Sequence, residues 1–223
     1  MKASMRVACA VAIKDLRSEW RAGELIFSLA QFALLGLLIA NFAFDITPTD
    51  TPQIAPGLLW LVAAFAGLVT VGRSFGNERD QASLESMLLT PASRLGILAG
   101  KAAVAVIMLS VCEVVVVAGL AFFFQVPVGS GSLIAALFLA NLGMAMVGTL
   151  FSALAAQIRS RELLLPILAF PLWIPLVVAG GRAVQVAMGG GGTFSWTPLA
   201  LLLDFDILFT VAAALTARFV LDD

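Results

Sequence analysis

Six apolar runs, each long enough to cross a bilayer, constrain this chain more than any other feature of its sequence. A hydrocarbon core of about 30 Å needs about 20 apolar residues for one helical crossing. Since 61% of the 223 residues are hydrophobic, the sequence predicts an all-α polytopic membrane protein with a single transmembrane domain over 1–223. The expected spans lie at about 25–44, 54–75, 101–125, 132–157, 162–180 and 197–219.

The positions of the basic residues predict the orientation of these spans. Of the 13 Lys and Arg residues, twelve lie in or border the N-terminal segment, the connections after the second and fourth spans, and the C-terminal end, and the connections after the first, third and fifth spans contain only Arg182. Basic residues gather on the cytoplasmic side of membrane proteins. Both termini are therefore expected in the cytoplasm.

Residues 2–22 have helical periodicity but carry too many charges to form a span. One face of the expected helix is mostly apolar, and the opposite face is basic and polar. The apolar positions are Met5, Cys9, Ala12, Ile13, Leu16 and Trp20, and the polar ones are Lys14, Arg17, Ser18 and Arg21. Such a helix lies in the membrane interface. Its basic face is expected to meet anionic lipid or a partner, and a topology anchor is the alternative.

The connection at 76–94 is expected to contain a short amphipathic helix on the cytoplasmic side. Asn77 suits its N-cap, and Pro91 ends it. Leu84, Met87 and Leu88 form an apolar stripe at helical spacing. A soluble motor can drive a membrane protein only through a cytoplasmic element that fits it, and this helix is the best candidate. A connector resting on the membrane is the alternative.

Three acidic residues fall inside the apolar runs. Glu113 follows Lys101 by about 18 Å of helix, which places it near the middle of the bilayer. An intramembrane carboxyl group is a functional candidate, or it forms a structural hydrogen bond, here with Ser110 or Asn141. Asp204 and Asp206 point to different faces of the last span. One of them could line an outer cavity, or the span begins later and both lie at the outer interface.

The fifth span contains Pro166, Pro171 and Pro175, and prolines remove backbone donors. We therefore expect a kinked or broken helix near a translocation path or a dimer seam, or a kink used only for packing. Gly180, Gly181 and the glycine tract at 189–192 predict a flexible outer loop that could hold a short re-entrant element.

The composition argues against an enzyme. The chain has no His and no Tyr, which removes the commonest metal ligand and general base. We expect no catalytic residues and no metal site. Cys9 and Cys112 are expected at different depths, so a disulfide is not indicated.

Several stretches, taken in order, resemble the CcmB family, the membrane permease subunit of the cytochrome c maturation system. These are Ile-Ala-Pro-Gly-Leu-Leu-Trp at 54–60, Ser-Leu-Glu at 83–85 with Leu-Leu-Thr-Pro at 88–91, Gly-Lys at 100–101, Leu-Leu-Pro at 164–166, and Phe-Pro-Leu-Trp-Ile-Pro at 170–175. The resemblance covers nearly the whole chain and is clearest from 54 to 180. It implies an ABC-2-type exporter permease fold, in which the helix between spans two and three couples to a separate ATPase subunit.

The resemblance also implies roles, partners and a location. The ATPase contact would be formed by Glu78, Arg79, Asp80, Ser83, Leu84 and Glu85, to which the apolar stripe adds Met87 and Leu88. The prolines at 166–175 would shape the permease core. Implied partners are a cytoplasmic ABC ATPase that binds ATP, a histidine-bearing haem-handling membrane subunit, a small accessory membrane protein, a periplasmic haem chaperone and a second copy of this chain.

The implied location is the bacterial cytoplasmic (inner) membrane. The expected function is haem export, or loading and release of the chaperone, driven by the partner's ATP hydrolysis. Haem is a possible substrate, and no cofactor is expected to bind the chain directly. The alternatives are an ABC-2 exporter of a lipid, glycan or drug, and a non-transporting scaffold that transmits ATPase motion to a haem-handling subunit.

Overall fold

The described part of the chain is entirely helical. The computed structural model describes residues 2–43, 50–80, 93–156, 161–191, 193 and 195–222, and within them it contains seven helices and no strand. The helices are α1 (Lys2–Ala22), α2 (Glu24–Ala43), α3 (Thr51–Asp80), α5 (Arg94–Phe124), α6 (Gly131–Ala156), α7 (Arg161–Ala187) and α8 (Thr197–Asp222).

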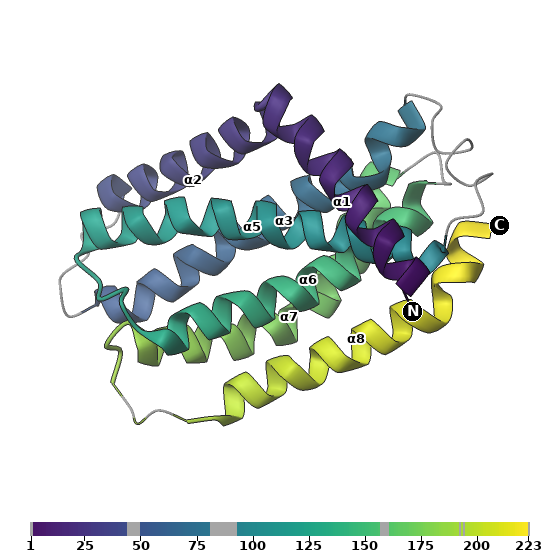
Figure 1. The fold of residues 1–223 in the computed structure, drawn as a ribbon. Coiled ribbons are helices and arrows are strands. Elements are labelled where there is room, and N and C mark those ends of the chain that lie inside the picture. Colours follow the sequence, from purple (N-terminus) through teal and green to yellow (C-terminus); the bar gives the residue numbers. More distant parts are fainter. Residues whose placement is uncertain are drawn as a thin grey trace.

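Six of these helices, α2 to α8, are long and apolar enough to cross a membrane. This confirms the six spans expected from the sequence. They run up and down beside one another, and both termini lie at the same end of the bundle (Figure 1). We call this end of the bundle the termini end. The common position of the termini agrees with an even number of crossings, and their cytoplasmic location stays a prediction.

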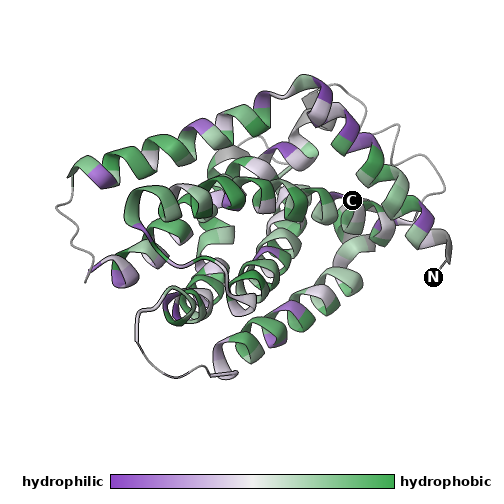
Figure 2. Cartoon of the chain, turned by 60° about the vertical axis from the view of Figure 1, so that its left-hand side comes forward, coloured by the Kyte–Doolittle hydropathy of each residue, from purple (hydrophilic) through white to green (hydrophobic). Residues whose placement is uncertain are grey.

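The centre of the bundle is formed by α3, α5 and α6. Helix α6 packs against α3, α5, α7 and α8. The outer helices α2, α7 and α8 leave most of their apolar surface uncovered, including Phe42, Ile167 and Leu215. Hydrophobic residues therefore cover the outside of the bundle as well as its core (Figure 2), as expected where lipid is the solvent.

Helices α3 and α7 interlock through two tryptophans and two glycines. The indole of Trp173 on α7 lies against Gly67 on α3, where an added Cβ would approach its Cη2 to 3.0 Å. The indole of Trp60 on α3 lies against Gly180 on α7, where an added Cβ would overlap the ring. Each helix thus supplies the gap that the other helix fills. Glycine at such contacts lets membrane helices approach closely.

This interlock corrects the expected end of the fifth span. Gly180 and Gly181 were expected in a flexible outer loop, but α7 continues through them to Ala187. Position 180 requires glycine because Trp60 occupies the space where a side chain would lie, whereas a Cβ at Gly181 would lie at an ordinary 3.7 Å from the same ring. The chain leaves the helix only at Gly189 and Gly191, whose positive φ values of 84° and 78° suit glycine.

The three prolines of α7 do not break it. The helix is continuous through Pro166, Pro171 and Pro175, which excludes the broken form of the expected kinked or broken helix. Pro171 is exposed and the other two are half-buried. The prolines therefore lie toward the outer surface of the bundle, while Ala169, Trp173 and Leu176 occupy the interior.

We predict that Gly180→Ala will lower the thermal stability of the purified protein in detergent. The added methyl group must displace Trp60, which is 2% exposed, and overpacking of this kind costs about 1–3 kcal/mol. The measurement is the melting temperature of the variant beside that of Gly57→Ala, since a Cβ at Gly57 meets nothing within 4 Å. Equal melting temperatures for the two variants would contradict the interlock.

Candidate functional site

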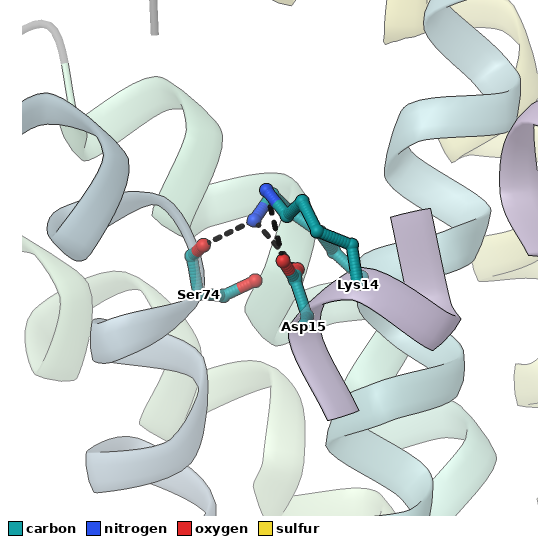
Figure 3. Close-up of polar contacts among 4 residues, drawn as sticks. Lys14, Asp15 and Ser74 are labelled. Atoms are coloured by element: carbon teal, nitrogen blue, oxygen red, sulfur yellow. Dashed lines mark hydrogen bonds and ion pairs between the residues drawn. The ribbon is translucent and has the colours of Figure 1, made fainter. Parts of the chain in front are cut away.

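A buried lysine joins three helices at the termini end. Lys101 lies two turns into α5, and its side chain is 1% exposed. Its Nζ donates to Asp15 Oδ2 on α1 at 3.0 Å and to the carbonyl oxygen of Ser74 on α3 (Figure 3). The ammonium group also lies 4.8 Å from the centre of the Phe75 ring. Lys14 forms a second ion pair with Asp15 at 3.0 Å. We call these five residues the lysine node.

The lysine node shares Phe75 with an apolar cluster at the same end, which is distinct from the main core. This cluster includes Phe75 of α3, Ile97 and Leu98 of α5, and Ala213 and Ala217 of α8. The ammonium group is therefore surrounded by hydrocarbon except where its polar partners approach. A buried charge is tolerated only with such partners.

A second polar contact joins α3 to the junction between α1 and α2. Arg73 on α3 lies 3.9 Å from Glu24, the first residue of α2. Burial raises the pKa of the nearby Glu19 on α1, and the positive charge of Arg73 partly offsets this effect. Gly23, with φ of 68°, separates α1 from α2. Helix α1 is thus linked to α3 through Lys101, and α3 contacts the start of α2 through Arg73.

The lysine node lies at the base of the segment predicted to contact an ATPase. Helix α3 continues through Asp80, so Asn77 lies within that helix and does not cap a new one. Glu78, Arg79 and Asp80 form its last turn. Ser83, Leu84, Glu85, Met87 and Leu88 lie outside the described residues. The chain returns at Ser93, whose Oγ accepts from Gly96 N and caps α5.

Inside the bundle, Glu113 meets Asn141 across the α5–α6 contact. Asn141 Nδ2 donates to Glu113 Oε2 at 2.7 Å and lies 3.3 Å from Ser110 Oγ. Glu113 is 3% exposed, and Asn141 is fully buried. Among the described residues, Glu113 Oε1 and Asn141 Oδ1 have no hydrogen-bond partner. The structure therefore contains the interhelical hydrogen bond that was expected as the structural alternative for Glu113.

The two aspartates of α8 have opposite environments. Asp204 is exposed on the outer side of the helix, and Asp206 is 3% exposed. Asp206 faces α6, where an added Cβ at Gly143 would lie 2.7 Å from its Oδ1. The different directions were predicted. Because α8 begins at Thr197, Asp206 lies about 14 Å along the helix, which does not support the later start that would have placed both residues at an interface.

Neither oxygen of Asp206 has a hydrogen-bond partner among the described residues. Glu113 and Asp206 contact residues 141 and 143 of α6, which point in directions about 200° apart on a helix. They therefore form two separate polar positions on opposite sides of α6. The glycine at 143 provides the space for the Asp206 carboxyl group.

The sequence-based analysis missed the lysine node. It placed Lys101 at the entrance to a span, whereas α5 begins seven residues earlier, at Arg94. The helical pattern at 94–100 was the available signal, because Leu95, Ile97 and Leu98 extend the apolar run toward the N-terminus. No group of three or more metal-ligating side chains occurs in the described part of the chain, where Cys9 is exposed and Cys112 is buried, both as free thiols.

Comparison with known proteins identifies the family. The family model described as "CcmB protein" matches residues 6–221. The chain belongs to the CcmB family. It is 29% identical over 214 residues to Heme exporter protein B of Paracoccus denitrificans, covering 92% of this chain and 97% of that protein. It is 28% identical over 194 residues to Heme exporter protein B of Rhodobacter capsulatus, covering 86% and 88%.

A third relative is similar over its full length. Heme exporter protein B of Bradyrhizobium diazoefficiens is 25% identical over 223 residues, covering 98% of this chain and all of that protein. Together with the six apolar helices, these matches establish a multi-pass membrane protein of the CcmB family.

For this CcmB-family chain we predict that Asp15→Asn will be strongly destabilising, since it removes the Asp15 carboxylate from the buried Lys101 ammonium group. Breaking a buried pair costs about 3–5 kcal/mol; the 19% exposure of Asp15 favours the lower end. The Asp15→Asn/Lys101→Met double variant should regain most of the stability, because it removes the charge as well. A double-mutant cycle of melting temperatures in detergent measures this coupling, and additive effects would refute it.

We predict that Glu113→Gln will fold and keep at least part of its activity, because the amide oxygen of Gln can still accept from Asn141. Glu113→Lys should assemble poorly, because it brings two donors together in a buried site. Yield from the membrane and formation of c-type cytochromes measure assembly and activity. Normal cytochrome formation in the lysine variant would remove Glu113 from the candidate residues.

Proposed function

We propose that this chain is the membrane permease subunit of an ABC transporter complex that exports haem, or loads and releases a haem chaperone, in c-type cytochrome biogenesis. Membership of the CcmB family and the names of the relatives support the haem role. The chain works in this proposal as a homodimer with an ABC-2-type fold in the bacterial inner membrane. A separate cytoplasmic subunit binds and hydrolyses ATP.

The observation that carries the coupling proposal is the position of the lysine node. Residues 81–92 connect α3 to α5, and Lys101 ties these two helices to each other and to α1. A displacement of the connection by an ATPase is therefore passed to three helices together. Glu78, Arg79, Asp80, Ser83, Leu84, Glu85, Met87 and Leu88 are the proposed contact residues.

The exposed side of α7 supports the proposed pairing of two copies. Leu163, Ile167, Ile174 and Val178 are large, exposed and on the same side as Pro171. Such a surface suits lipid or another apolar helix. The other proposed partners are a histidine-bearing haem-handling membrane subunit, a small accessory membrane protein and a periplasmic haem chaperone, with haem as substrate and not as a resident cofactor.

The enclosure of Glu113 and Asp206 favours one alternative, a scaffold that transmits ATPase motion to the haem-handling subunit without transporting haem itself. Both residues are 3% exposed. A scaffold tolerates neutral replacements at these positions, whereas a transporter that uses them in a pathway does not. In either case the ATPase contact is essential.

We predict that Leu84→Asp or Glu85→Lys will weaken binding of the ATPase subunit and leave membrane insertion intact, because both positions fall between the second and third spans expected from the sequence. The measurement is native mass spectrometry of the complex captured through a C-terminal tag. The expected wild-type complex contains two copies of this chain, two ATPase subunits and a haem-bearing membrane partner.

A conservative Leu84→Met variant serves as the control and should retain the ATPase. Unchanged ATPase recovery with both charged variants would refute the proposed contact. Recovery of the wild-type chain with the ATPase and without a haem-bearing partner would favour a general ABC-2 exporter.

A further inference from the structure

Helix α1 has three distinct faces. The face toward the bundle is formed by half-buried residues at positions 4, 7, 8, 11, 12, 15, 16 and 19. The next face is apolar and exposed, with Met5 at 68%, Ile13 at 64% and Trp20 at 75% exposure. The third face carries Arg6, Lys14, Arg17 and Arg21. All four are exposed.

Close packing fixes the rotation of α1. An added Cβ at Gly96 would lie 2.7 Å from the carbonyl oxygen of Ser4, and one at Gly100 would lie 2.6 Å from that of Ala8. The backbones of α1 and α5 therefore nearly touch. The Asp15–Lys101 ion pair on the same side of α1 adds a polar constraint. The helix cannot turn its apolar or basic face toward the bundle without losing these contacts.

The position of α1 suits a lipid headgroup layer. The helix crosses α5 obliquely at the termini end, while the spans run along the bundle (Figure 1). Its apolar face needs hydrocarbon, and its basic face, next to it, needs water or anions. The boundary between acyl chains and headgroups supplies both environments side by side. An acidic protein surface would match the basic face only and leave Trp20 and Ile13 in water.

We propose that the basic face of α1 binds the headgroups of anionic lipids, with the phosphate groups on Arg6, Lys14, Arg17 and Arg21. Guanidinium groups pair with phosphate in a bidentate way. The four positions face one side over most of the helix length, so one layer of headgroups reaches all of them. This lipid site is independent of the proposed haem function.

The lipid site is connected to the lysine node. Lys14 lies on the basic face and pairs with Asp15, which also accepts from buried Lys101. A phosphate group that binds Lys14 competes with Asp15 for its ammonium group. Asp15 is then available to Lys101 alone. Anionic lipid therefore strengthens the contact that holds α1 to α5.

The native cysteine at position 9 allows a direct test with the full-length protein. Cys9 is exposed on α1 and Cys112 is buried, so a fluorescent maleimide reacts at position 9. The labelled protein is reconstituted into phosphatidylcholine vesicles that contain phosphatidylglycerol. The same nitroxide quencher is attached either to phosphatidylglycerol or to phosphatidylcholine, at equal amounts.

We expect the quencher on the anionic lipid to quench the label more strongly. One well-placed basic residue should raise the local concentration of anionic lipid on the order of fivefold. Salt should reduce this preference, because the Debye length shortens with ionic strength. The Arg6→Gln/Arg17→Gln/Arg21→Gln variant should lose most of it. Arg182→Gln on α7 is the control for removal of a charge elsewhere and should keep it.

Equal quenching by the two lipids in the wild-type protein would overturn the proposal, and this result requires no variant to fold. A preference that salt does not change would also overturn it. In the assembled complex, loss of quenching by both lipids would show that a protein partner covers α1 in place of lipid.

Discussion

The burial of one ammonium group determines how the termini end of this protein is built. Removing a lysine from water costs several kcal/mol, and Lys101 can remain buried only because three helices supply its surroundings. Asp15 provides the opposite charge, Ser74 a carbonyl oxygen and Phe75 an aromatic face. Helix α1 must therefore lie where Asp15 reaches α5. The directions of the other two faces of α1 follow from that contact, and so do the relative positions of the ends of α3 and α5.

The sequence predicted the features that follow from the length of an apolar run or from the geometry of a single helix. All six spans were found because hydrocarbon thickness sets a length that apolar runs reveal directly. The Glu113–Asn141 hydrogen bond was anticipated because a mid-bilayer carboxyl group needs a polar neighbour, and few are available. The divergence of Asp204 and Asp206 follows from helix geometry alone.

Other features could not be predicted, because apolar residues face both lipid and protein in a membrane bundle. Hydropathy placed Met5 and Ile13 on the apolar face of residues 2–22, but it did not show that Val7 and Val11 pack on α5. It suggested a loop at Gly180, where the glycine accommodates an indole from another helix. It also treated Lys101 as a boundary marker, since its Asp15 partner lies 86 residues away in the chain.

The contact of Trp60 and Trp173 with glycines on the opposite helix has a consequence for sequence change in this family. Two such contacts, seven residues apart on each helix, fix α3 and α7 against both sliding and rotation. A larger residue at Gly67 or Gly180 is acceptable only when the facing tryptophan becomes smaller. In related chains, a larger residue in place of one of these glycines should therefore occur together with a smaller residue in place of the facing tryptophan. The summed side-chain volume at each contact should stay nearly constant.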